Sequence, residues 1–160
     1  MPGSARIARL VLFASLSLPQ APALEAIDIS LQGDWSTTLG ALDLEAGAGS
    51  ELTGVHQSDT DHAVISIAGA TGPWRVDARK SDLTWDSALQ LAVRRTSDGT
   101  GSGSISGGTS YLDVSAFDAT LFSGDADRDG VDLQIRLSGV SAALGASSFS
   151  TTLTYTVVDE

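Results

Sequence analysis

The sequence predicts an all-β fold, an immunoglobulin-like antiparallel β-sandwich of about eight or nine strands, with a β-barrel as the alternative. Runs in which apolar and polar residues alternate recur along the chain, and a period of two is typical of half-buried strands. No segment sustains apolar residues at helical spacing between helix caps. Turns rich in Gly, Ser and Asp separate the alternating runs, as short antiparallel strands require.

Five segments show the strand pattern most clearly: residues 26–31, 73–79, 84–95, 131–137 and 148–158. In each of them the apolar side chains share one parity, which predicts one buried and one solvated face. Trp74 and Trp85 have the parity of the apolar positions in their strands, so both are expected in the core. Weaker patterns predict strands at 35–44, 62–68 and 111–122.

The low-complexity segment 97–110 consists mainly of Gly and Ser. These residues offer little apolar area to hold a loop against the domain, so a flexible surface excursion is predicted. The alternatives are a binding loop and, at the stretch SGGTSY, a bulge where another backbone approaches closely.

The first 23 residues contain two arginines, the apolar run LVLFASLSL and small residues ending at Ala23. This order is typical of a secretory signal peptide. The apolar run is too short to cross roughly 30 Å of hydrocarbon, so no transmembrane span is expected. We expect cleavage near Ala23, one domain over 24–160, and a protein that is secreted to the extracellular space or the cell envelope.

The chain is strongly acidic and contains no cysteine. Its net charge is −11, and removal of residues 1–23 takes away Arg6 and Arg9 but no acid, which gives −13. Such a surface repels phosphate backbones, so nucleic acid is not an expected partner. Without disulfides, the domain must be held by its hydrophobic core alone.

No catalytic signature is present. The chain has neither a G-x-S-x-G nucleophile elbow nor an S-x-x-K motif. Its two histidines and 20 carboxylates show no spacing that selects a triad or an acid/base pair. We therefore expect a protein without enzymatic activity.

The stretch GDADRDG, residues 124–130, has three aspartates at alternate positions followed by glycine. This is how a calcium-binding loop begins. Oxygen ligands would come from Asp125, Asp127, Asp129 and the carbonyl of Val131. A complete EF-hand is excluded, because Arg136 replaces the bidentate glutamate and a strand pattern follows. Two interpretations remain: a weak calcium site and a β-hairpin turn closed by the Asp-Gly pair.

Trp35 has no clear strand parity and is the candidate for a surface indole that stacks on sugar rings. It supports an alternative function, that of a monomeric extracellular module that binds carbohydrate or calcium.

The signal peptide, the alternating segment 26–31 and the closing segment SFSTTLTYTVVDE together resemble secreted bacterial fimbrial subunits and spore-coat-protein-U-like domains. The resemblance implies a sandwich that lacks one strand, which the N-terminal extension of a neighbouring subunit supplies. Here the donor would present Ile27, Ile29 and Leu31, with Gly33 as the hinge. The alternative is an ordinary first strand that pairs within its own domain.

The expected function is that of a secreted cell-surface protein with a structural or adhesive role. In its most specific form, the protein is a pilus or fibre subunit that assembles by its N-terminal donor strand. Its partner would be a second copy of the chain or another surface protein.

Overall fold

The computed structural model describes residues 26–81 and 85–160. The expected signal peptide lies outside these residues. Within them, the chain forms ten strands and two short 3-10 helices: β1 (Asp28–Gln32), η1 (Ala41–Asp43), β2 (Val55–Gln57), β3 (Ala63–Ala68), β4 (Trp74–Lys80), β5 (Gln90–Arg95), β6 (Ile105–Gly107), β7 (Leu112–Asp113), β8 (Ala119–Gly124), β9 (Arg128–Ser138), η2 (Ala142–Leu144) and β10 (Leu153–Asp159).

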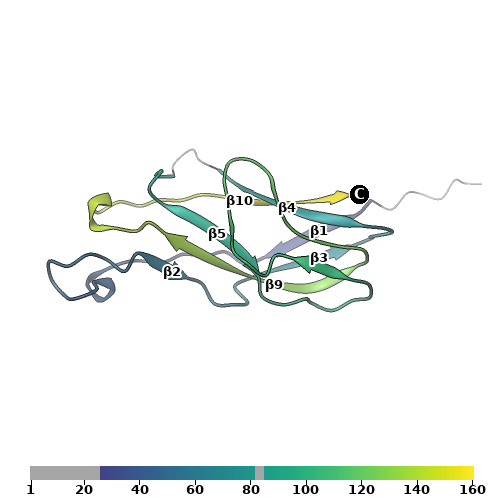
Figure 1. The fold of residues 1–160 in the computed structure, drawn as a ribbon, viewed down its shortest axis with the longest axis horizontal. Helices are drawn as coiled ribbons and strands as arrows, with labels where there is room; N and C mark the ends of the chain where they lie inside the picture. The colour runs from purple at the N-terminus through teal and green to yellow at the C-terminus, as the bar shows by residue number, and fades with distance from the viewer. Residues whose placement is uncertain (1–25, 82–84) are drawn as a thin grey trace, which may run out of the picture.

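The strands form two antiparallel sheets that run along the long axis of the molecule (Figure 1). The first sheet has the order β1-β3-β9-β5-β7, and β2 also pairs with β9. The second sheet has the order β10-β4-β8-β6. Each sheet has two edges and neither closes on itself, so the predicted sandwich is confirmed and the barrel alternative is wrong.

The core lies between the sheets. It consists mainly of the apolar side chains at the alternate strand positions that the sequence predicts to be buried. Trp74 is fully buried, and its ring meets the ring of Phe122 edge to face at 6.0 Å. The indole nitrogen of Trp74 donates to the carbonyl of Ala126 at 3.0 Å, which satisfies its one polar group. Trp85 packs against the core but stays partly exposed.

Four predicted strands differ from the structure. The segment 148–158 forms a strand only from Leu153, which continues to Asp159. Residue 84 lies outside the described residues, and 85–95 forms a strand only from Gln90, because Asp86 builds a turn by accepting from Ala88 and Leu89 at 2.8 and 3.1 Å. The segment 35–44 contains only η1 and one isolated bridge, from Leu44 to Leu52. The segment 111–122 is divided between β7 and β8, which belong to different sheets.

The Gly/Ser segment 97–110 carries the chain from the first sheet to the second. It leaves β5, runs beside β9 at the Thr100–Asp129 bridge, and then forms β6 against β8. The amide of Arg95 also donates to the carbonyl of Gly108 at 2.5 Å. The prediction of a flexible excursion is therefore wrong, and the alternative of close backbone approach is confirmed.

The stretch GDADRDG is not a hairpin turn, because β8 and β9 do not pair and lie in different sheets. Its glycine has another use. Ser66 on β3 faces both Asp129 and Gly130 on β9, which is a β-bulge. Gly130 has φ +71°, the left-handed conformation that such a bulge requires. The Asp-Gly signal thus marks a bulge within a strand.

Candidate functional site

The predicted assembly residues lie on β1, which pairs with β3 of the same chain along its whole length. Ile29 is opposite Ile67, and Leu31 is opposite Ile65. Ile27 and Ile29 are half-buried and pack against the core, whereas Leu31 is 44% exposed. β1 therefore occupies the place of an ordinary first strand, while its apolar row ends in a side chain that its own domain leaves in solvent.

The two sides of the sandwich differ in the length of their edge strands. β1 and β10, with five and seven residues, lie near each other at one side. The other edge strands, β2, β6 and β7, have only three, three and two residues. An edge strand presents unpaired backbone N–H and C=O groups in proportion to its length. The β1/β10 side is thus the larger open template for another strand.

The three aspartates of the GDADRDG stretch bind two different segments, the Gly/Ser segment and the region of β3 with the turn that follows it. Asp125 accepts from the amide and the hydroxyl of Ser104, at 2.6 and 3.0 Å. Asp127 accepts from the amide of Ala70 at 2.7 Å, and Asp129 accepts from the hydroxyl of Ser66 at 2.6 Å.

The fourth expected calcium ligand, the carbonyl of Val131, belongs to a β9 residue whose side chain is fully buried. Across the described chain, no group of three or more acidic, His or Cys side chains is arranged to hold a metal ion. The structure therefore does not bring the expected calcium ligands together. These aspartates fasten neighbouring segments instead.

The hydrogen bonds from Ser104 hold the pKa of Asp125 below its ordinary value. A carboxyl with a depressed folded-state pKa stabilises the fold above its unfolded pKa of about 3.9 and loses this contribution as the pH falls through the folded pKa. We expect Asp125→Asn to lower the melting temperature at pH 7, with the difference from wild type vanishing in strong acid. Thermal melts between pH 7 and 2, with Asp61→Asn as a charge-matched control, measure this. A difference that is independent of pH would contradict it.

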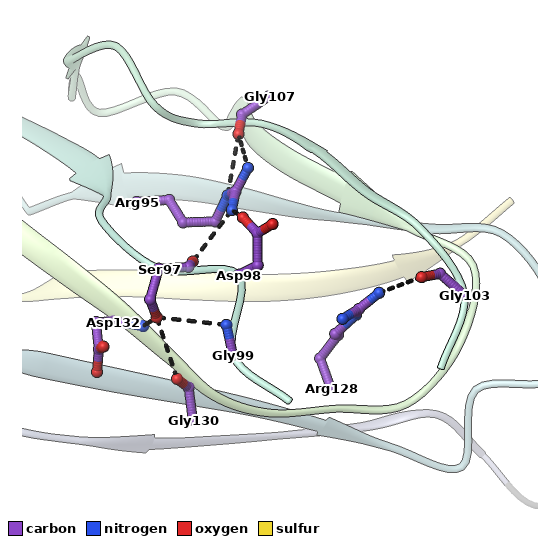
Figure 2. A network of polar contacts seen from close by, with 9 residues as sticks. All are labelled: Arg95, Ser97, Asp98, Gly99, Gly103, Gly107, Arg128, Gly130 and Asp132. Atoms are coloured by element: carbon purple, nitrogen blue, oxygen red, sulfur yellow. Dashed lines mark hydrogen bonds and ion pairs between the residues drawn. The ribbon is translucent and has the colours of Figure 1, made fainter. Parts of the chain in front are cut away.

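Two buried arginines hold the Gly/Ser segment in place (Figure 2). Arg95 and Arg128 are 5% and 7% exposed. Arg95 donates to the carbonyls of Gly107 and Ser97, and Arg128 donates to the carbonyl of Gly103. Guanidinium groups with several donors suit this task, since one side chain satisfies carbonyls from separate turns. The arginines act here as structural fasteners for a segment in which Ile105 is the one large apolar side chain packed against the core.

On the outer face of the first sheet, two further arginines enclose an aromatic ring. The guanidinium carbons of Arg94, on β5, and Arg136, on β9, lie 4.9 and 4.1 Å from the centre of the Tyr111 ring. Gln134 lies between them and is buried. Its side-chain oxygen accepts from the Arg94 Nε at 2.9 Å and from the Tyr111 hydroxyl at 3.0 Å. These four residues form a cation–aromatic cluster, which we call the Tyr111 cluster.

The sequence alone does not predict the Tyr111 cluster. The alternation in 84–95 and 131–137 does place Arg94, Gln134 and Arg136 on the faces of their strands that are predicted to meet solvent. Only the pairing of β5 with β9, which sets Arg94 opposite Gln134, shows that they meet.

Trp35, the expected sugar-stacking residue, is half-buried and packs against the core. Trp35 lies in the connection between β1 and β2.

None of the helices in the described residues is long and apolar enough to cross a membrane. Comparisons with protein families, with curated proteins and with solved structures find no match to this chain.

Proposed function

We propose that this chain is a secreted cell-surface protein with a structural or adhesive role, and that it associates with a second copy through the β1 side of the sandwich. The observation that carries the proposal is the exposure of Leu31 at the end of the apolar row of an edge strand. Within the monomer, 44% of this side chain stays in solvent. A neighbouring strand that adds to the edge would cover it.

The open edges support the same proposal. β1 and β10 are the longer edge strands, and they lie together on one side. Proteins usually shorten, bend or charge such edges to prevent strand addition. The connection from β1 to β2 spans residues 33–54 and contains only η1, which is enough chain for β1 to pair with a neighbour instead of its own β3.

We expect Leu31→Lys to abolish self-association and to leave the monomer folded. At an exposed strand position the change in folding stability should stay within about 0.5 kcal/mol. A lysine on an edge strand opposes strand addition, because its charge would be buried. Size-exclusion chromatography with light scattering on the chain from residue 24 onward, over a range of concentrations, measures the effect.

Val55→Lys is the matched control. Val55 is 49% exposed and lies on β2, which pairs with β9 and not with β1 or β3. It should leave association unchanged. Equal effects of the two substitutions, or a wild-type protein that is monomeric at every concentration, would sink the proposal. Deletion of residues 24–33 is a less specific test, because it also removes Ile27 and Ile29 from the core.

A further inference from the structure

A hollow of about 430 Å³ lies on the outer face of the first sheet, next to the Tyr111 cluster. Its lining residues are Thr60, Arg94, Arg95, Thr96, Thr109 and Asp132. They come from the turn before β3, from β5 and the residue after it, from the end of the Gly/Ser segment and from β9. The volume falls in the lower part of the range of about 300–1,000 Å³ that small-molecule sites occupy.

Arg94 presents an oriented guanidinium to this hollow. Its Nε is fixed by Gln134 at 2.9 Å, and its guanidinium carbon lies over the Tyr111 ring. In the described residues, no hydrogen bond or ion pair engages its two terminal nitrogens. A guanidinium held in this way loses little freedom on binding, and its free fork matches the two oxygens of a carboxylate.

The rest of the lining suits hydroxyl groups. Within the part of the chain that the structure describes, no hydrogen bond engages the hydroxyls of Thr60 and Thr109 or the carboxylate of Asp132. Hydroxyls donate and accept, and a carboxylate accepts, so together they can satisfy neighbouring ring hydroxyls. Asp132 and the net charge of −11 also oppose ligands that carry many negative charges. The complementary ligand is rich in hydroxyls and carries one acidic group.

We propose that this hollow binds a saccharide that carries a carboxylate, of the uronic acid class. Arg94 holds the carboxylate, and Thr60, Thr109 and Asp132 hold the ring hydroxyls. The site is separate from the edge used in the proposed assembly, since β3 and β9 lie between β1 and β5. The two proposals therefore stand or fall independently.

Isothermal titration of the chain from residue 24 onward with sodium glucuronate, glucose and inorganic phosphate tests the ligand class. Glucuronate is expected to bind at least about tenfold more tightly than glucose, the effect of one charge-assisted contact. Its affinity should fall as salt rises, because the contact is ionic and partly exposed. Equal binding of glucose and glucuronate, binding of phosphate alone, or no binding of any of the three would overturn the proposal.

Arg94→Gln should remove the preference for glucuronate over glucose, and Arg94→Lys should retain only part of it, since lysine keeps the charge but lacks the fork. The control is Arg79→Gln, which also removes one positive charge from an exposed strand position, here paired with Asp118 at 3.5 Å. Thr109→Val is a second site variant that leaves the Tyr111 cluster intact and should weaken both sugars. Unchanged glucuronate binding in a folded Arg94→Gln protein would refute the assignment.

Discussion

Replacement of Arg95 by methionine is expected to lower the free energy of unfolding by about 2–4 kcal/mol. The Nε and one terminal nitrogen donate to the carbonyl of Gly107 at 3.1 and 2.9 Å, and the other terminal nitrogen donates to the carbonyl of Ser97 at 3.1 Å. Methionine fills much of the same volume but donates no hydrogen bond. Urea unfolding at pH 7, with unchanged m values, measures the difference.

The ion pair of Arg95 with Asp98 is not the source of this stability. The Asp98 side chain is 71% exposed, so solvent screens the pair and its contribution is small. Asp98→Asn should therefore cost less than about 1 kcal/mol. Equal losses in the two variants would assign the stability to the ion pair. A methionine variant as stable as the wild type would show that Arg95 does not hold the Gly/Ser segment.

The same fastening shapes the proposed saccharide site. The Gly/Ser segment contributes Thr109 to the hollow, and Arg95 itself forms part of the lining. The hydrogen bond from the backbone amide of Arg95 to the carbonyl of Gly108 fixes the segment beside β5. The buried hydrogen bonds of Arg95 thus help to set the shape of the hollow, although Arg95 need not contact the saccharide itself.

The sequence predicted the sandwich well where strands have one buried face. In β4 and β9, for example, the fully buried Trp74, Val76, Val131 and Leu133 all have the predicted parity. This succeeded because burial on one face of a strand imposes a period of two whatever the partner strand is. Which face of a strand is apolar can be read from the strand's own residues, without knowledge of the rest of the fold.

What the sequence did not predict depends on which segments meet. Ser and Gly residues carry no periodicity, so neither β6 nor the course of the segment beside β9 was visible. The carboxylates of Asp125, Asp127 and Asp129 looked like one ligand set because their spacing is regular. Instead, Asp125 accepts from Ser104 in the Gly/Ser segment, whereas Asp127 and Asp129 accept from Ala70 and Ser66 in the region of β3.

In the Tyr111 cluster, too, the pattern within each strand was predictable and the contacts between segments were not. The solvated parity of Arg94 and Arg136 was visible in the sequence, but their common contact with Tyr111 was not. That contact needs the register in which Arg94 faces Gln134, and the placement of the chain just before β7. Register between strands more than 30 residues apart is set by the packed core and is not encoded in either strand alone.

Gly101→Ala is expected to destabilise the protein by about 2–4 kcal/mol. Gly101 has φ +150°, a conformation that residues with a side chain rarely adopt, and a Cβ there would lie 2.2 Å from the carbonyl oxygen of Asp127. That oxygen belongs to the backbone, so relief requires the Gly/Ser segment and the β8–β9 connection to move apart. Chemical unfolding gives the magnitude.

Gly130→Ala separates backbone strain from this steric clash. Gly130 also has a positive φ, +71°, but a Cβ there would meet no atom within 4 Å. Gly130→Ala should lower the free energy of unfolding only by the backbone strain, about 1–2 kcal/mol. Gly130→Asn should lower it less, because Asn tolerates the left-handed conformation. If Gly101→Ala costs no more than Gly130→Ala, the backbone contact between the Gly/Ser segment and Asp127 is not close. A larger cost at Gly101 means that the segment lies against the β8–β9 connection in solution, as its contact with Arg128 requires.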